Sequence, residues 1–414
     1  MIAKLALQSL ADRKGSVMLS LLAMTVSIFV LLGVEHIRHQ TKQNFSSTVS
    51  GIDLIVGART GSLNLLLYSV FRIGSPTNNI RWQTYENITN NNQVKWAIPI
   101  SLGDSHKGYR VLGTTKSYFQ HFSYGKKRHL AFSDGREFDQ VFDLVLGSEV
   151  ANKLGYKLGD KVVLAHGIAA TSFSMHDDRP FTVVGILAAT GTPVDQTLHV
   201  SLQGIEAIHI DWQQGAKIPN SGLTQSELEQ VELQPKSITA FMLCLKSKIA
   251  TFQIQRNINE YKLEPVVAIL PGVALSELWR MIGVLENALI LVSALVFIAA
   301  CLGVSSMLLA SIRERRYEIQ LLRIIGAPPY FLFLLIELEA FLITLLSCVF
   351  GSGLLVACLA LLQDYLVYQY GIHIESNLLN QNSLYLIAAI LSASIVVSII
   401  PSFNGYRKAK STLL

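Results

Sequence analysis

Four runs of this sequence contain no charged residue and approach or exceed the roughly 20 residues that a membrane-spanning helix needs. They occupy residues 17–34, 288–310, 340–362 and 384–400. Only 15% of the 414 residues are charged, whereas soluble globular domains carry about 25%. The sequence therefore predicts an α-helical membrane protein with four transmembrane helices.

Lysines and arginines are unequally distributed among the segments that flank these runs. The N-terminus, residues 311–329 and the C-terminal tail are rich in them, whereas residues 363–382 contain none. Basic residues in short loops stay on the cytoplasmic side of a membrane. We therefore expect a multi-pass protein of the plasma (inner) membrane with both termini in the cytoplasm and residues 35–283 outside.

This topology divides the chain into seven parts. The expected parts are an elbow helix and first transmembrane helix in residues 1–34, a large α+β domain in 35–283, a second transmembrane helix in 284–310, a cytoplasmic segment in 311–329, a third transmembrane helix in 330–362, a short outer loop in 363–382, and a fourth transmembrane helix with a cytoplasmic tail in 383–414. The elbow helix is expected because Lys4, Gln8 and Asp12 form a polar stripe on a largely apolar helix. The alternative is the start of the first transmembrane helix.

Residues 35–283 have the pattern of a mixed α and β domain. Short runs, mostly rich in β-branched residues, read as strands. Examples are VKWAIPI at 94–100, DKVVLAHG at 160–167, PFTVVGIL at 180–187 and TLHVSL at 197–202. Helical segments such as SEVANKLG at 148–155 lie between them. We therefore expect an α+β domain inserted between the first and second transmembrane helices. GxSxG, HExxH and phosphate-loop motifs are absent from the sequence, so a membrane-bound enzyme is the least favoured class.

The charged segment (residues 311–329) contains four arginines and two glutamates between two apolar runs. Tyr317, Leu321, Ile324 and Ile325 are spaced to form one apolar face of a short helix, which Gly326 is expected to end. An apolar face surrounded by charges suits a groove on a partner protein. The alternative is a basic loop that contacts only lipid headgroups, which would need neither the apolar face nor the glutamates.

The ten histidines all fall in the parts expected outside the membrane or at its outer edge. His176, Asp177 and Asp178 are consecutive and follow His166 by ten residues. Imidazole and carboxylate ligands suit zinc or a related divalent ion, so these four residues form a candidate metal site. Their spacing matches no standard ligand motif, and a polar surface loop is the alternative.

The charged segment resembles the signature of the FtsX-like permeases, the group that includes macrolide-exporter and lipoprotein-releasing ABC permeases. The stretch ERRYEIQLLRIIGAPP fits the pattern R-x-x-E-I-x-x-L-R-x-x-G-A through Arg315, Glu318, Ile319, Leu322, Arg323, Gly326 and Ala327. Two stretches of the α+β domain, VLGSEVANKLGYKLGDKVVL and FTVVGILAATGTPVDQTLHVSL, resemble pieces of the periplasmic domain of that family.

The resemblance implies the permease subunit of an ABC transporter in a bacterial inner membrane. Such a subunit couples ATP hydrolysis in a separate ATPase to movement of its periplasmic domain, for export, for lipoprotein or peptide extrusion, or for mechanotransmission. The expected partners are two ABC ATPase subunits that use ATP and Mg²⁺, a second permease copy that is identical or related, a periplasmic partner, and membrane lipid, without nucleic acid. The residues expected to contact the ATPase are Glu314, Arg315, Arg316, Glu318, Leu321, Leu322, Arg323 and Gly326.

Two other functions stay open at this point. The chain could be a transmembrane regulator of a periplasmic cell-wall hydrolase, or a component of a divalent-metal (zinc) transport system. Apart from zinc at the candidate site, no cofactor is expected to bind this chain directly.

Overall fold

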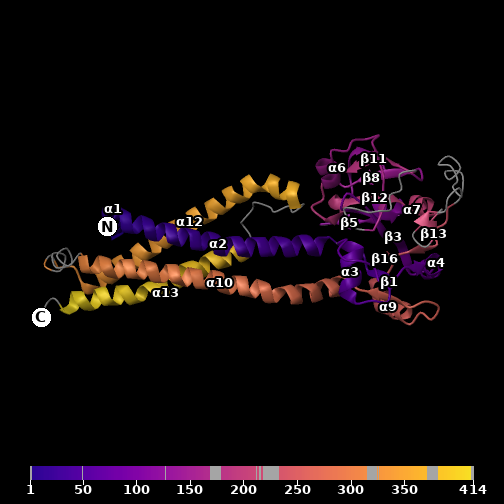
Figure 1. Cartoon of the computed structure of the whole chain (residues 1–414). Helices are drawn as coiled ribbons and strands as arrows, with labels where there is room; N and C mark the ends of the chain where they lie inside the picture. The colour runs from indigo at the N-terminus through magenta and orange to yellow at the C-terminus, as the bar shows by residue number, and fades with distance from the viewer. Residues whose placement is uncertain are drawn as a thin grey trace. The chain divides into compact units, whose positions relative to one another are not determined.

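The computed structural model describes most of the chain, in two compact units (Figure 1). The described residues are 2–48, 50–125, 127–167, 179–210, 212–213, 216–217, 233–314, 324, 326–370 and 381–411. The helical unit takes its described residues from 1–41, 282–364 and 374–414, and the inserted domain takes most of its own from 42–281.

Long apolar helices characterise the helical unit. They are α1 (Ile2–Asp12), α2 (Lys14–Ser47), α10 (Pro271–Glu314), α12 (Pro329–Tyr370) and α13 (Gln381–Ser411). Four spans within them are long and apolar enough to cross a membrane: Lys14–Lys42, Pro271–Ala310, Tyr330–Gln363 and Gln381–Asn404. The predicted four apolar helices are therefore confirmed.

Helix α12 packs closely on α2 and α13 within this unit. A Cβ atom added to Gly351 would lie 3.2 Å from Ile28 Cγ2 of α2, so this glycine permits a close approach of the two helices. Ser347 donates a hydrogen bond to a backbone carbonyl of α2 at 3.3 Å. The hydroxyls of Thr344 and Ser394 lie 2.6 Å apart and join α12 to α13. Small and hydroxyl side chains thus form the contacts, as is usual between membrane helices.

Helices α2 and α10 extend beyond the uncharged runs of the sequence. An ion-pair network connects their polar continuations: Arg38 lies 2.9 Å from Glu35 and 3.7 Å from Glu286. Arg38 and Glu35 belong to α2 and Glu286 belongs to α10, so the network links the two helices within the helical unit.

A mixed sheet forms the centre of the inserted domain. Across the sheet, the strands follow the order β17 (Val266–Ile269), β1 (Leu54–Ala58), β16 (Ala240–Leu245), β3 (Val94–His106), β4 (Tyr109–Thr114), β12 (Thr197–Ser201), β8 (Asp143–Leu146), β11 (Phe181–Leu187) and β7 (Phe132–Gly135). Two short strands pair beside this path: β10 (Ala165–His166) with β3, and β9 (Lys161–Val162) with β11. Strand β12 is parallel to β4 and β11 is parallel to β8, whereas the other neighbours along this order are antiparallel.

Both connections to the membrane helices join this sheet through neighbouring strands. Strand β1 follows α2, and β17 precedes α10. The two strands pair antiparallel, with Ile55 opposite Ile269 and Ala58 opposite Val266. Small two-stranded pairs complete the described strands: β2 (Ile80–Arg81) with β15 (Ser237–Ile238), β5 (Ser123–Tyr124) with β6 (Arg128–His129), and β13 (Trp212–Gln213) with β14 (Ala216–Lys217).

Apolar cores cover both faces of the sheet, because successive strand residues point to opposite sides. Along β1, Ile55 belongs to the core on one face, whereas Leu54 and Val56 belong to a core on the other. Along β8, Val145 faces the first core and Leu144 faces a third. Strands with both faces buried read as nearly continuous apolar runs, which explains sequences such as LIVGA in β1.

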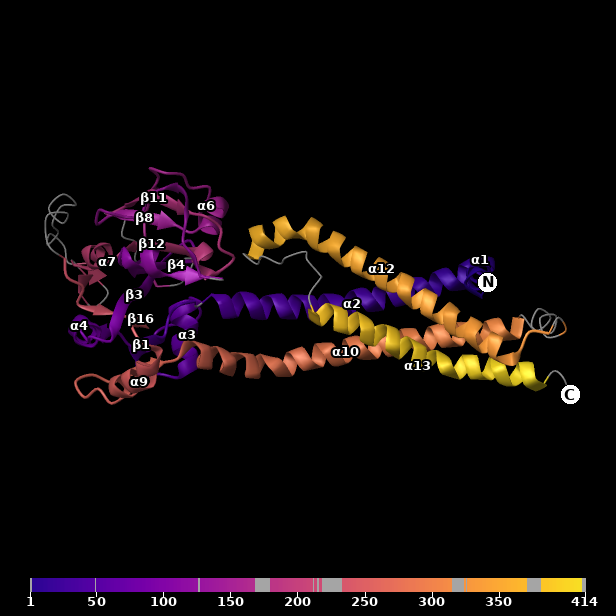
Figure 2. The ribbon, with the colours of Figure 1, turned by 180° about the vertical axis from the view of Figure 1, so that it is seen from behind.

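Short helices of the inserted domain (Figure 2) contribute buried residues to these cores. Residues of α3 (Ser62–Val70) and α5 (Ser117–His121) join the first core, α4 (Trp82–Thr89) and α9 (Thr251–Asn259) join the second, and α6 (Ser148–Leu154) and α7 (Leu202–His209) join the third. Two single 3₁₀ turns, at Pro193–Gln196 and Lys248–Ala250, complete the described helical segments. The predicted fold class is confirmed: a large domain of helices and strands lies between the first and second apolar helices.

Candidate functional site

The charged segment is described by the structure only near its two ends. Helix α10 is described as far as Glu314, and α12 begins at Pro329, in a first helical turn that tolerates proline. Gly326 lies just before α12 with a φ of +96°, in the left-handed region that glycine adopts readily. This is the backbone conformation that the sequence predicts for a helix-ending glycine.

The remaining residues of the predicted ATPase contact lie outside the described part of the chain. They are Arg315, Arg316, Glu318, Leu321, Leu322 and Arg323. Their role stays a prediction from the sequence.

An ion pair connects the N-terminal helices to α12 within the helical unit. Arg13, between α1 and α2, donates from Nη2 to the Glu339 carboxylate at 2.8 Å and to the Ser9 hydroxyl at 3.0 Å. Ser9 in turn donates to the same carboxylate. The side chains of Arg13 and Glu339 are only 12% and 3% exposed. A buried charge is costly unless it is paired. Separating α1 from α12 would break this pairing, so the network holds the two helices together.

The neighbouring carboxylate of α12 points elsewhere. Ser398 of α13 donates to Glu337 Oε2 at 2.7 Å. Two helical residues that are two positions apart lie on different faces, so Glu337 contacts α13 while Glu339 contacts Arg13. The two carboxylates therefore do not form a paired acid site.

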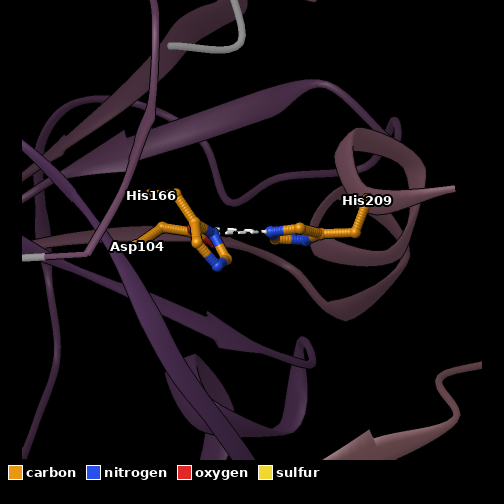
Figure 3. A group of neighbouring side chains, drawn as sticks. All are labelled: Asp104, His166 and His209. Atoms are coloured by element: carbon orange, nitrogen blue, oxygen red, sulfur yellow. Dashed lines mark hydrogen bonds and ion pairs between the residues drawn. The ribbon is translucent and has the colours of Figure 1, made fainter. Parts of the chain in front are cut away.

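Three side chains from distant parts of the inserted domain meet near the end of β3 (Figure 3). They are Asp104, His166 and His209, and each offers one ligand atom within 4.8 Å of the other two. Residues 104, 166 and 209 lie on β3, on β10 and at the end of α7. We call them the His–Asp cluster.

A β-bulge places Asp104 in this cluster. The pairing of β3 with β4 shifts register between Leu102 and Ser105, so Asp104 falls at the irregularity. It pairs instead with His166 across the two-residue strand β10. The next residue, Gly167, donates its backbone N–H to the carbonyl of Gly103 at 3.0 Å. These backbone contacts hold the aspartate and the histidine opposite each other.

The end of α7 supplies the third member. His209 is the last residue of that helix, and its Nδ1 lies 2.7 Å from the carbonyl oxygen of Ile205. A carbonyl oxygen can only accept, so Nδ1 carries the hydrogen and donates. This contact directs Nε2 of His209 toward the other two members of the cluster.

Close contacts join all three ligand atoms. His166 Nδ1 lies 3.0 Å from Asp104 Oδ1, and His209 Nε2 lies 3.1 Å from His166 Nδ1 and 3.5 Å from Asp104 Oδ1. Burial by itself raises the pKa of Asp104, but hydrogen bonds from His166 and His209 outweigh it and bring the pKa to about 2. Burial lowers the pKa of His209, but the hydrogen bond to Asp104 and its charge outweigh that effect and raise the pKa above its usual range. The cluster is thus a buried anion faced by two imidazoles.

A third histidine lies near the cluster but makes other contacts. His106, two residues after Asp104, places Nδ1 at 2.6 Å from the carbonyl oxygen of Val163 and Nε2 at 2.9 Å from the Tyr156 hydroxyl. Both ring nitrogens therefore already have hydrogen-bond partners.

The cluster contains one residue of the metal site predicted from the sequence. His166 is shared, whereas His176, Asp177 and Asp178 lie outside the described residues, so their part in that site stays a prediction. Asp104 and His209 were not anticipated. Their elements are separated from His166 by long stretches of sequence, and only the fold brings them together.

Another histidine is buried deep in the domain. His199 of β12 is fully buried, and its ring lies 5.3 Å from Tyr118 and 6.0 Å from Phe119, measured between ring centroids. Burial, with a smaller contribution from the nearby Arg72 charge, lowers the pKa of His199 to about 3. This imidazole is therefore neutral at physiological pH.

Comparison with known families finds two matches that together cover most of the chain. The family "MacB-like periplasmic core domain" matches residues 17–261, which is more than half of the chain, and "FtsX-like permease C-terminal" matches residues 290–409. A search of curated proteins finds no match.

Two solved structures are among those similar to this chain. The periplasmic region of MacB from Actinobacillus actinomycetemcomitans is 10% identical, with a TM-score of 0.34, over 56% of this chain and 94% of that one. The extracellular domain of the noncanonic ABC-type transporter YknZ from Gram-positive bacteria is 12% identical, with a TM-score of 0.31, over 53% of this chain and 98% of that one.

Proposed function

The chain belongs to the family of ABC-transporter permeases with a MacB-like periplasmic core domain and an FtsX-like C-terminal region, and we propose that it couples ATP hydrolysis in a separate ATPase to movement of its inserted domain. Members of this family work with an ABC ATPase subunit. ATP and Mg²⁺ would bind that partner, and the chain itself would not hydrolyse ATP, since its sequence contains no phosphate loop.

One observation carries the proposal. Helix α10 is unbroken over 44 residues, from Pro271, just after β17, to Glu314 at the start of the charged segment. At 1.5 Å per residue such a helix is about 66 Å long. A continuous helix transmits displacement along its axis because all its backbone hydrogen bonds are internal. Movement of the charged segment would therefore reach the last strand of the inserted domain along one continuous helix.

The distribution of charge supports an orientation. With the charged segment on the cytoplasmic side, both termini are cytoplasmic and the inserted domain is periplasmic, in a bacterial inner membrane. Lys4, Arg13, Arg407 and Lys408 then lie on the same side as the arginines of the charged segment, as the distribution of basic residues in membrane proteins requires.

A groove in the helical unit is an argument for a second permease copy. It measures about 610 Å³ and runs between α2 and α10. Its lining consists mainly of alanine, serine and glycine, including Ser20, Ala23, Ala300 and Gly303. Small residues allow the close approach of another membrane helix. Two permease copies, identical or related, with two ATPase subunits would complete the transporter.

The experiment that tests the coupling role compares two substitutions in the charged segment. Leu321→Asp places a carboxylate in the apolar face proposed to contact the ATPase. An unpaired buried charge costs several kcal/mol, and each 1.4 kcal/mol is about tenfold in affinity. We expect the variant to lose its ATPase subunit during purification.

Arg316→Ala is the matched control. An exposed ion pair contributes about 0–1 kcal/mol, so this variant should retain most of the ATPase. Both variants should reach the membrane at the wild-type level, since the changes lie outside the four apolar spans. Wild-type stoichiometry of the ATPase with Leu321→Asp, together with intact transport, would mean that the segment is only a basic loop.

A further inference from the structure

We propose that Asp104, His166 and His209 of the inserted domain bind a single Zn²⁺ ion. The two histidines supply imidazole nitrogens and the aspartate supplies a carboxylate oxygen, and this is a usual ligand set for zinc. The inference goes beyond the coupling function and does not depend on it.

The spacing of the three ligand atoms fits one tetrahedral ion. Zinc binds histidine nitrogen and carboxylate oxygen at about 2.0–2.2 Å, so neighbouring ligand atoms of a tetrahedron lie about 3.3 Å apart. The three distances in the His–Asp cluster are 3.0, 3.1 and 3.5 Å. A zinc ion therefore fits against all three atoms without rearrangement of the backbone.

Hydrogen bonds alone cannot satisfy this triangle of atoms. An imidazole nitrogen carries either a hydrogen or a lone pair, and the ionised Asp104 carboxylate carries no hydrogen. If both His166 Nδ1 and His209 Nε2 carry hydrogens, two donors face each other at 3.1 Å. If only one carries a hydrogen, the other directs a lone pair at the carboxylate. A cation between the three atoms removes the conflict, because every one of them can then direct a lone pair toward it.

The surroundings of His209 prepare its Nε2 as a ligand. Its Nδ1–H donates to the carbonyl oxygen of Ile205 at 2.7 Å, so when the ring binds a metal in its neutral form the lone pair lies on Nε2. A metal-bound histidine usually donates its other N–H to a carbonyl or carboxylate in this way, which sets the tautomer and the ring orientation. Asp104, whose side chain is only 2% exposed, supplies the buried negative charge that attracts the cation.

The ion would be exchangeable. Half of the His166 side chain and about a quarter of the His209 side chain are exposed, at 50% and 26%. Three protein ligands leave a fourth position of a tetrahedral ion for water or another ligand, whereas purely structural zinc sites have four protein ligands. Such a site suits reversible binding of zinc from solution.

The test measures zinc binding by the full-length chain in detergent, carrying an affinity tag without histidine and stripped of metal. Calorimetric titration with Zn²⁺ should show one equivalent bound. His166→Ala and His209→Ala should each weaken binding by about 100-fold or more, since a lost ligand costs more than the 10–100-fold of a lost supporting contact. His129→Ala removes an exposed histidine elsewhere in the domain and should bind as the wild type does.

Two further measurements separate ligand loss from unfolding. His166→Ala is the main variant because that side chain is half exposed, and the metal-free variant should match the circular dichroism of the metal-free wild type. Co²⁺ in place of Zn²⁺ should give the intense visible absorption bands of a four-coordinate ion, and these bands should disappear in His209→Ala. No binding by the wild type, or unchanged binding by both alanine variants, would leave a hydrogen-bonded surface cluster and overturn the zinc site. Since no ATPase is present, either result leaves the coupling proposal untouched.

Discussion

Removing Arg13 should destabilise the helical unit strongly, whereas removing both charges of its ion pair should not. In Arg13→Ala, the Glu339 carboxylate, which is 3% exposed in the wild type, would lose its guanidinium partner. Breaking a buried pair from one side costs about 3–5 kcal/mol, but replacing both partners by apolar residues is often neutral. We therefore expect Arg13→Ala to be the least stable variant and Arg13→Met combined with Glu339→Leu to approach the wild type.

Two native cysteines provide the assay. Cys301 of α10 and Cys348 of α12 are 3% and 4% exposed, so a thiol-reactive fluorophore can label them only when the helices separate. The less buried Cys244 and Cys358 are first replaced by serine. On heating in detergent, the temperature at which half of these thiols are labelled should fall clearly for Arg13→Ala and recover in the double variant. Equal midpoints for wild type and Arg13→Ala, or a double variant whose loss equals the sum of the single losses, would refute the reasoning.

Further expectations concern activity, topology, metal binding and pH. The purified chain alone should not hydrolyse ATP, and robust hydrolysis by a preparation free of ATPase subunits would contradict the assigned role. In a cysteine-free background, a membrane-impermeant thiol probe should label Asn92→Cys in the inserted domain and fail to label Ser411→Cys at the end of α13; the opposite pattern would reverse the orientation. If His176 and Asp178 contribute to the zinc site, the double alanine variant should bind zinc more weakly by calorimetry, and an unchanged titration would confine the site to the His–Asp cluster. The pKa of His199 is about 3 in the folded protein against an ordinary 6.5, so below pH 6.5 the unfolded chain binds a proton that the folded chain does not. The free energy of unfolding of the inserted domain should therefore fall as the pH drops below 6.5, by about 2 kcal/mol at pH 5. His199→Phe should lose this part of the acid sensitivity in pH-dependent thermal unfolding, and an identical pH profile would contradict it.

Local sequence patterns predicted much of this fold. Strands β11 and β12 and helix α6 coincide with stretches whose apolar periodicity and flanking glycines indicated them, because their burial pattern repeats within the element itself. The stretch DKVVLAHG at 160–167 was expected to form one strand and instead forms β9 and β10. These two strands pair with different partners, β11 and β3, and the choice of partner depends on residues far away in the chain.

The His–Asp cluster likewise depends on residues that are far apart in the chain. His166 stood out because it precedes a histidine and two aspartates in the sequence. Asp104 looked like an ordinary polar residue near the end of a strand, and its position in the cluster depends on a register shift against β4. His209 is placed by the packing of α7. The register shift of β3 and the packing of α7 cannot be read from any one stretch of sequence. The histidines and aspartates near residue 176 could therefore suggest a metal site, but they could not identify Asp104 and His209 as ligands.

The pairing of β1 with β17 has a mechanical consequence. The start of β1 lies opposite the end of β17, so the connections to α2 and α10 leave the sheet at the same end of one antiparallel ribbon. Ladder hydrogen bonds run perpendicular to the strands. A force that slides one connection past the other strains all the bonds of the ribbon at once, in shear, whereas a force that spreads them sideways opens the bonds one at a time, like a zipper. The β1–β17 ribbon is therefore stiff against sliding and weak against spreading. A pull delivered equally through both connections would displace the two strands together without straining the bonds between them.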